Sequence, residues 1–408
     1  MLGERGTKVP GLGVVIFKDG SEIFSTFLGN RIIDGEQSKP VTRDTRFRAA
    51  SVSKMFTAMS ILQLIELGVL DPDEDVGRYL NFRLRNPNFP QKKITVRMLA
   101  AHTSSLRDGK IYSAPPDCEL EEFFSSSGRF FEGGAHFAPS IEEPGEYFHY
   151  SNLNYGVLGT IIERVTGERF DLYQKKHLFK QLEMKADYVP GNFEHREFEM
   201  LGATYQKKNP RGEWDERGRW FGKSDDYRGV QPSKETLALQ NPYDETFQST
   251  YSLQNYRVGT NATIFSPQGG LRISFDEMSR TLEMLLDGGE FRGHRILSRN
   301  SIDMLLTPQW TFDPTIQNGN TYDGALLSYG FGTHPIEFRG RTWLGHSGEA
   351  FGMLSGLFFD PIARDGFAYM INGTAIDVEN DPRARGIFSN NYIWEEQMLD
   401  AIENILHQ

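Results

Sequence analysis

Cysteine is almost absent from this chain of 408 residues. The single residue, Cys118, rules out an internal disulfide and any metal site built from several cysteines. It says little about the compartment in which the protein works. Its ordinary role is that of a small packing residue.

Long apolar runs are also missing. No segment approaches the roughly 18 apolar residues that indicate a membrane span. The opening residues, MLGERGTKVPGLGVV, lack the charged-then-apolar order of a signal peptide. We therefore predict no membrane span and, for the chain as given, a cytoplasmic protein, or an extracytoplasmic one if a leader was removed.

Positive charge is outweighed by negative charge, and the formal net charge is -11. Nucleic-acid-binding domains are usually strongly basic, so nucleic acid is not an expected partner. The histidines His136, His149 and His177 lack metal-like spacing such as His-Glu-x-x-His. The sequence therefore predicts neither a metal nor a cofactor.

The two ends of the chain carry strand patterns. Five stretches are apolar and rich in β-formers: 11–17, 22–28, 341–346, 353–360 and 366–372. Asp19-Gly20 joins the first two as a hairpin turn, and Ser347-Gly348 supplies turn residues after the third. Residues 386–406 have near-helical apolar spacing, which predicts a terminal helix lying on a sheet.

Helical patterns dominate between these ends. Three segments are each followed by glycine: 51–67, 152–166 and 275–286. A length of 408 residues, at roughly 150 residues per domain, favours two or three domains. We predict a sheet domain from 1–45 and 311–408, and a mainly helical domain from 46–310.

Residues 190–260 are polar and irregular, with scattered aromatic and proline residues. Loops of this length are usually lids, binding loops or disordered segments, and the aromatic residues argue against plain disorder. The pattern leaves open a substrate-covering element or a packed surface excursion.

Chemistry is first indicated by Ser51-Val52-Ser53-Lys54, at the start of the apolar helix pattern. Positions three apart on a helix are neighbours, so Lys54 would lie beside the Ser51 hydroxyl. A buried lysine with a lowered pKa can accept the proton of a serine nucleophile. The unpaired N–H groups at the helix start also favour a developing oxyanion.

A second element is Tyr150-Ser151-Asn152, immediately before the helix pattern that begins at Asn152. A tyrosine near the lysine can relay a proton, and asparagine can contact a substrate amide through both donor and acceptor atoms. The same Tyr-x-Asn spacing at Tyr79 lies in a turn and short helix, where packing is the favoured role.

A third element is His346-Ser347-Gly348, followed by Glu349. Glycine allows a substrate backbone to approach the strand, and the Glu349 N–H can join the Ser51 N–H as an oxyanion donor. Each such donor typically contributes about 10²–10³ in rate.

These elements, in this order, resemble the penicillin-recognising serine hydrolases: class C β-lactamases, D-alanyl-D-alanine carboxypeptidases, D-aminopeptidases and related esterases. The resemblance also includes PGLGVVIFKDG, TRFRAASVSKMFTA, LAAHTSSL, SPQGGLRIS and YGFG, and it spans most of the chain. A related set of motifs marks other penicillin-binding enzymes.

The resemblance implies an α+β fold, with an antiparallel sheet flanked by terminal helices and an inserted helical domain. It implies Ser51 as the acylated nucleophile, Lys54 as its proton acceptor and Tyr150 as a second acid/base group. Asn152 would contact the substrate, and His346 would stand where most β-lactamases have a lysine that helps hold a carboxylate. His102, in LAAHTSSL, would be structural.

Two residues depart from the β-lactamase pattern. Histidine at 346 holds a carboxylate less firmly than lysine, since its unperturbed pKa is about 6.5. Glu349 adds a carboxylate, which suggests selection for a cationic substrate group. We expect a serine hydrolase acting on a D-amino-acid peptide or small ester more than on a β-lactam. The alternative is a penicillin-binding sensor or inactive relative that is acylated, or only binds, without turnover.

Overall fold

A computed structural model describes residues 8–241 and 244–407. Its main sheet has seven strands in the order β14-β15-β16-β17-β1-β2-β3, with antiparallel neighbours throughout. The strands are β1 (Gly11–Lys18), β2 (Ser21–Ile32), β3 (Lys39–Pro40), β14 (His334–Phe338), β15 (Arg341–Ala350), β16 (Met353–Asp360) and β17 (Asp365–Ile371). The predicted pairing of strands from both ends of the chain is therefore correct.

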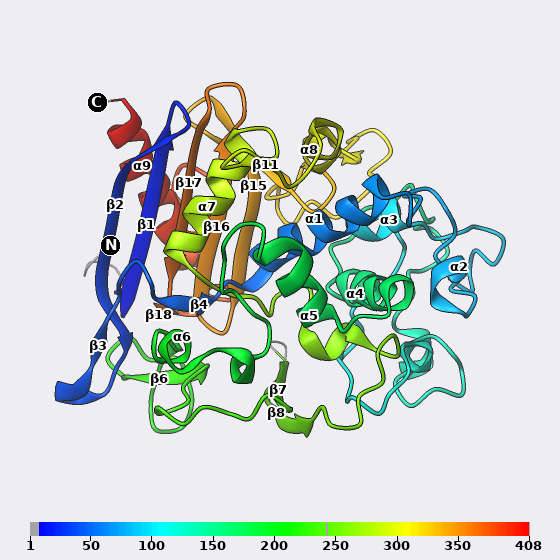
Figure 1. Ribbon diagram of the computed structural model, residues 1–408, viewed down its shortest axis with the longest axis horizontal. Coiled ribbons are helices and arrows are strands. Elements are labelled where there is room, and N and C mark those ends of the chain that lie inside the picture. The colour runs from blue at the N-terminus through cyan, green and yellow to red at the C-terminus, as the bar shows by residue number, and fades with distance from the viewer. Residues whose placement is uncertain (1–7, 242–243, 408) are drawn as a thin grey trace.

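Helices cover both faces of this sheet, α7 (Phe275–Leu286) on one and α9 (Ile393–Leu406) on the other (Figure 1). Alternation along β1 supplies both cores, since Val15 packs with the α7 side and Ile16 with the α9 side. The predicted C-terminal helix is present. An N-terminal helix has no counterpart from residue 8 onward, where β1 soon begins, and residues 1–7 lie outside the described part.

The remaining helices lie mostly beside the sheet: α1 (Ser53–Glu66), α2 (Gly77–Leu80), α3 (Val96–Ala100), α4 (Leu153–Thr166), α5 (Phe170–Gln174), α6 (His195–Glu199) and α8 (Arg299–Leu306). Helix α1 runs from the sheet into this helical region (Figure 1). Its residues are buried almost all round, as the apolar pattern predicted. Helix α4 ends at Gly167, whose φ of +69° suits a residue without Cβ.

The expectation of an irregular 190–260 segment is wrong. It contains α6 and four strands: β5 (Thr204–Lys208), β6 (Arg219–Ser224), β7 (Thr236–Asn241) and β8 (Asp244–Ser252). Strand β5 pairs with β6 and with β18 (Gly373–Thr374). The β6 residues are exposed or half-buried on both faces except at Ser224, so they carry little apolar periodicity for a sequence to reveal.

Short pairs complete the secondary structure: β4 (Arg46–Arg48) with β9 (Arg272–Ser274), β10 (Glu290–Phe291) with β11 (His294–Arg295), and β12 (Trp310–Thr311) with β13 (Ser328–Tyr329). The division at 46 and 310 stays a prediction. Helix α7, inside that range, packs on the main sheet rather than among the other helices. No helix within the described ranges combines the length and apolar character that crossing a membrane requires.

Candidate active site

Ser51 lies in a single 3-10 turn, η2 (Ala50–Val52), which leads directly into α1. Ala50 has a φ of +46°, so the chain bends sharply just before the serine. The first N–H groups of a helix precede any intrahelical acceptor. This turn therefore places both the Ser51 hydroxyl and its N–H where a ligand can reach them.

Lys54 follows one turn later and is completely buried. Its Nζ lies 3.0 Å from Ser51 Oγ, 2.9 Å from Asn152 Oδ1 and 3.0 Å from the Gln268 main-chain oxygen. Burial lowers the pKa of Lys54 to about 7, against the opposing effect of the Asp108 carboxylate. The amide and main-chain oxygens only accept, so a neutral amine donates its two hydrogens to them and turns its lone pair toward Ser51.

Asp108, which sequence reasoning missed, fixes the orientation of Asn152. The Asn152 Nδ2 donates to Asp108 Oδ2 at 2.9 Å, which turns its Oδ1 toward Lys54. Asp108 Oδ1 also accepts from Ser151 Oγ at 2.8 Å and from the Leu153 N–H at 2.9 Å. The carboxylate thus holds the start of α4 and, through Asn152, the direction of the lysine lone pair.

Tyr150 lies against both groups of the Ser51 motif. Its hydroxyl shares a hydrogen bond with Ser51, and Lys54 Nζ is 4.6 Å from the centre of its ring. Burial raises the pKa of Tyr150 well above its usual 10, although the bond to Ser51 acts in the opposite direction. The phenol therefore keeps its proton near neutrality and can donate it.

Hydrogen bonds between uncharged side chains link His102, Tyr329 and His346 next to Tyr150. The His102 ring stacks on it with centroids 4.3 Å apart, and His102 Nδ1 accepts a main-chain N–H at 3.1 Å. The hydrogen therefore sits on His102 Nε2, 3.2 Å from Tyr329 Oη. Tyr329 in turn donates to His346 Nε2 at 2.8 Å, and His346 Nδ1 donates to the Ser347 carbonyl. His102 is buried and fully bonded, and it also supports the tyrosine.

His346 is not a cationic group in this site. Burial lowers its pKa well below the usual 6.5, and His334 and Lys54 lower it further. Its Nε2 is already occupied as an acceptor. A lysine at this position would hold a substrate carboxylate through its positive charge. The neutral His346 ring lacks that charge.

Beyond Gly345, no described strand pairs with the edge of β15 that lies beside Ser51. Pairing of β14 with β15 ends at His334 and Gly345, whereas β15 continues to Ala350. The Ser347 N–H points to this edge, because it donates to His334 Nε2 at 3.2 Å. N–H directions repeat every second residue, so the Glu349 N–H points there too. It can join the Ser51 N–H around a substrate oxygen.

The turn predicted at Ser347-Gly348 is wrong, since both residues continue the strand. Close approach explains the glycine instead. A Cβ at position 348 would lie 2.9 Å from the Ser51 nitrogen and 2.7 Å from the Ala49 oxygen. Only a residue without a side chain lets β15 and η2 meet.

This contact gives a first prediction. Gly348→Ala must separate β15 from η2, so the two oxyanion donors no longer converge, and we expect the acylation rate to fall by a factor of about 10²–10³. Stopped-flow acylation by a p-nitrophenyl ester measures it, with a thermal melt to confirm that the variant folds. A folded variant with unchanged acylation would contradict the two-donor arrangement.

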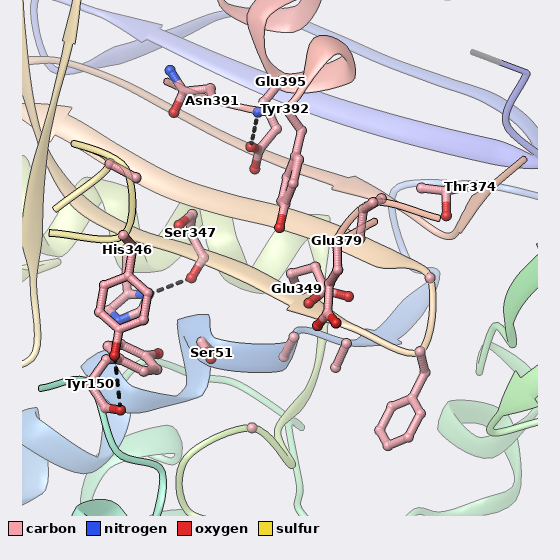
Figure 2. A pocket seen from close by; sticks show the side chains of 18 of the residues that line it. Ser51, Tyr150, His346, Ser347, Glu349, Thr374, Glu379, Asn391, Tyr392 and Glu395 are labelled. Carbon is pink, nitrogen blue, oxygen red and sulfur yellow. Dashed lines mark hydrogen bonds between the residues drawn. The ribbon is translucent and has the colours of Figure 1, made fainter. Parts of the chain in front are cut away.

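Six predicted residues line one cavity of about 690 Å³: Ser51, Tyr150, Asn152, His346, Ser347 and Glu349. Lys54 and Gly348 do not line the cavity, but both contact Ser51, which does. Tyr150 and His346 lie at one end, and Glu349 and Glu379 toward the other (Figure 2). Tyr79, by contrast, uses its hydroxyl to accept the Asp71 N–H at 2.9 Å.

Sequence reasoning missed several residues that complete the site: Asp108, Gln268, Tyr329, His334 and Glu379. Gln268 lies within the SPQGGLRIS stretch, Tyr329 opens the YGFG stretch and Asp108 comes two residues after LAAHTSSL, so a place in or near a motif was the only signal for these three. Within the described ranges, no cluster of three or more histidine, cysteine or acidic side chains has an arrangement suited to a metal ion.

Comparisons with known proteins identify the family and the fold. N-acetylmuramyl-L-alanine amidase of Bacillus subtilis (strain 168) is 27% identical over 402 residues, covering 91% of this chain and 80% of that protein. Protein flp of Staphylococcus aureus (strain MW2) is 28% identical over 204 residues. That match covers 48% of this chain and 39% of protein flp, so it spans well under half of that relative.

Two solved structures share the fold. The D-amino acid amidase of Ochrobactrum anthropi SV3, complexed with L-phenylalanine, has a TM-score of 0.63 at 21% identity, covering 97% of this chain and 95% of that one. The octameric penicillin-binding protein homologue of Pyrococcus abyssi has a TM-score of 0.61 at 23% identity, covering 90% and 70%. The β-lactamase family itself matches residues 2–390, so the chain belongs to the β-lactamase family of serine hydrolases.

Proposed function

We propose that the protein hydrolyses an amide or ester through an acyl-enzyme formed on Ser51. The observation that carries this proposal is the Lys54 amine, buried and held between two fixed acceptors, with its third direction toward Ser51 Oγ. A lysine whose pKa is lowered to about 7 by burial is a usable base near neutrality.

In acylation, Ser51 Oγ attacks the substrate carbonyl carbon while its proton passes to Lys54 Nζ. The carbonyl π electrons move onto oxygen, which the Ser51 and Glu349 N–H groups stabilise. The intermediate then collapses, the bond to the leaving nitrogen or oxygen breaks, and that atom takes a proton through Tyr150. Lys54 returns the proton to Tyr150, so both groups regain their starting states.

Deacylation uses the same groups in reverse order. A water molecule attacks the Ser51 ester and loses its proton to Lys54, either directly or through Tyr150. The ester bond breaks, Ser51 Oγ recovers a proton, and the acid product leaves. Asp108 positions Asn152 and therefore Lys54, and its carboxylate charge partly offsets the lowering of the Lys54 pKa by burial.

The charges around the cavity argue against a β-lactam, and the resemblance of the motifs to D-aminopeptidases and esterases favours a D-amino-acid amide, peptide or small ester instead. Recognition of a β-lactam carboxylate needs a cation beside the strand, and His346 and His334 both have pKa values lowered by burial. Glu349, three residues after His346 on β15, adds a carboxyl group to the cavity wall that becomes negatively charged when it ionises. Two comparison proteins are named as amidases, which fits amide cleavage.

A substrate panel tests the proposal: p-nitrophenyl acetate, D-alanyl p-nitroanilide, a D-alanyl-D-alanine peptide and nitrocefin. We expect multiple turnovers of the ester and the anilide and much slower turnover of nitrocefin. Intact-mass spectrometry of a quenched ester reaction should show an acyl group on the peptide that contains Ser51. Absence of that adduct with every substrate would overturn the acyl-enzyme mechanism.

The same panel separates the sensor alternative. A sensor would release one equivalent of chromophore from nitrocefin and then stop, because the acyl-enzyme would not hydrolyse. A hydrolase continues beyond one equivalent with at least one member of the panel.

A further inference from the structure

One end of the cavity is crowded with carboxylates that the mechanism above does not use. Glu349 and Ser347 are two apart on β15, so their side chains share a face of the strand. Around Glu349 lie Glu379 and Asp377, from the segment after β18, and Glu395 of α9. Burial, together with the negative charges of Glu379, Glu395 and Asp377, raises the pKa of Glu349 to about 8.

Two of these carboxylates are already bonded. Glu395 accepts from Tyr369 Oη at 2.7 Å, and Asp377 Oδ1 accepts the Glu379 N–H at 3.0 Å. Glu349 and Glu379 differ, because among the described residues no donor side chain or N–H bonds their carboxylates and no cation pairs with them. The pair Glu349 and Glu379 is therefore the part of the cluster free to bind a ligand.

Buried hydrogen-bonding atoms at the same end also lack partners. Thr374 and Gln206 are cross-strand neighbours on β18 and β5 and both line the cavity. Thr374 is completely buried and Gln206 is 7% exposed, yet Thr374 Oγ1 and Gln206 Oε1 bond to no described residue. Figure 2 shows Thr374 at the same end as Glu349 and Glu379. Buried polar atoms are normally satisfied, and a carboxamide oxygen can only accept.

The arginines that line the cavity do not neutralise this end. Arg48 donates to the Gly269 carbonyl at 2.9 Å and lies over the Phe351 ring at 4.9 Å. Arg385 has Asp323 as its nearest ion-pair partner, at 3.8 Å. The two carboxylates and the unpaired acceptors therefore suit a cation that donates several hydrogen bonds.

We propose that Glu349 and Glu379 bind a primary ammonium group carried by the substrate whose carbonyl reacts at Ser51. The inference rests on the proposed function and names its substrate class. A primary ammonium has three donors, enough for both carboxylates and a further acceptor such as Gln206 Oε1. A substrate main chain that pairs with β15 at Glu349 places alternate groups on the face of the Glu349 side chain. A carboxylate in that place would be repelled by both glutamates.

Matched substrates test the proposal and locate the ammonium. On the acyl side, D-alanyl p-nitroanilide is compared with its N-acetyl derivative. On the leaving side, the 2-aminoethyl ester of N-acetyl-D-alanine is compared with its propyl ester. The quantity measured is the ratio of kcat/KM for the charged and the neutral member of each pair, and a high ratio in either pair supports the ammonium site.

Glu349→Gln and Glu379→Gln should each lower that ratio about 10- to 100-fold, because each removes one charge-assisted hydrogen bond. Glu379→Lys should reverse the preference toward an N-succinyl anilide. Glu337→Gln, a substitution of an exposed glutamate on β14, is the matched control and should leave the ratio unchanged.

Ratios near one in the wild type, or ratios unchanged in all three cavity variants, would overturn the ammonium site. If Ser51 is still acylated by p-nitrophenyl acetate in that case, the proposed function survives; if no substrate acylates Ser51, the proposed function fails instead.

Discussion

Ser51→Ala is expected to lower kcat/KM for p-nitrophenyl acetate and for D-alanyl p-nitroanilide by at least roughly 10⁴-fold, the scale seen when a serine nucleophile is removed. Without Oγ no covalent acyl-enzyme forms, and the Lys54 amine has no proton to accept. The oxyanion donors remain, so a small residual rate above the uncatalysed reaction should persist. Initial rates and intact-mass spectra of the quenched reaction measure both effects.

A matched control lies on the same helix. Ser60 is completely buried in α1, and its Oγ bonds to no described residue. Ser60→Ala removes a hydroxyl without leaving a partner unpaired, so it should keep both the fold and the activity. Substantial activity in Ser51→Ala, measured beside a fully active Ser60→Ala control, would overturn the assignment of Ser51 as the acylated nucleophile.

The parts of the site that the sequence predicts are those set by local geometry. Ser51 and Lys54 are three apart at a helix start, and the structure places their atoms 3.0 Å apart. Tyr150 and Asn152 stand where a loop enters a helix, and both reach the same serine and lysine. Helical spacing and capping glycines depend on neighbouring residues, so they can be recognised without the fold.

The parts that were missed depend on contacts between distant segments. Asp108 lies 44 positions from Asn152, and nothing around it distinguishes a positioning carboxylate from an ordinary polar loop residue. Tyr329 opens the YGFG stretch, but its role follows only from the fold, which brings it between His102 and His346. The pattern Ser347-Gly348 predicts a turn, whereas the structure has a strand there, because the glycine is required by the approach of η2 and not by a bend.

Charge at the cavity was only partly visible in the sequence. Glu349 was identifiable because it follows His346-Ser347-Gly348 directly. Glu379 was not, because it comes from a segment 30 residues later that the sheet carries back beside β15. The sequence therefore indicated one carboxylate near the acyl site, whereas the fold gathers a cluster around it.

Lys54→Met is expected to lower the acylation rate by about 10³–10⁴-fold, the upper range for loss of a general base. Methionine has a similar reach but no lone pair on nitrogen. Lys54→Arg should be as inactive although it keeps the positive charge, because a guanidinium does not give up its proton in this pH range. An active arginine variant would mean that Lys54 acts through its charge and not as a base.

The pH dependence of kcat/KM should report the titration of Lys54. Burial lowers the folded-state pKa of Lys54 from 10.5 to about 7, so the ammonium form predominates below that pH and cannot accept the Ser51 proton. Activity toward a neutral ester should therefore rise with pH through about 7.

Asp108→Asn removes a carboxylate that raises this pKa, so the rising limb should shift to lower pH. The same variant should also lose rate, because its new amide no longer holds Asn152 in one orientation. A neutral ester is the right probe, since the titration of Glu349 would alter the binding of a cationic one. A limb that stays in place in Asp108→Asn while kcat falls would assign Asp108 to positioning alone.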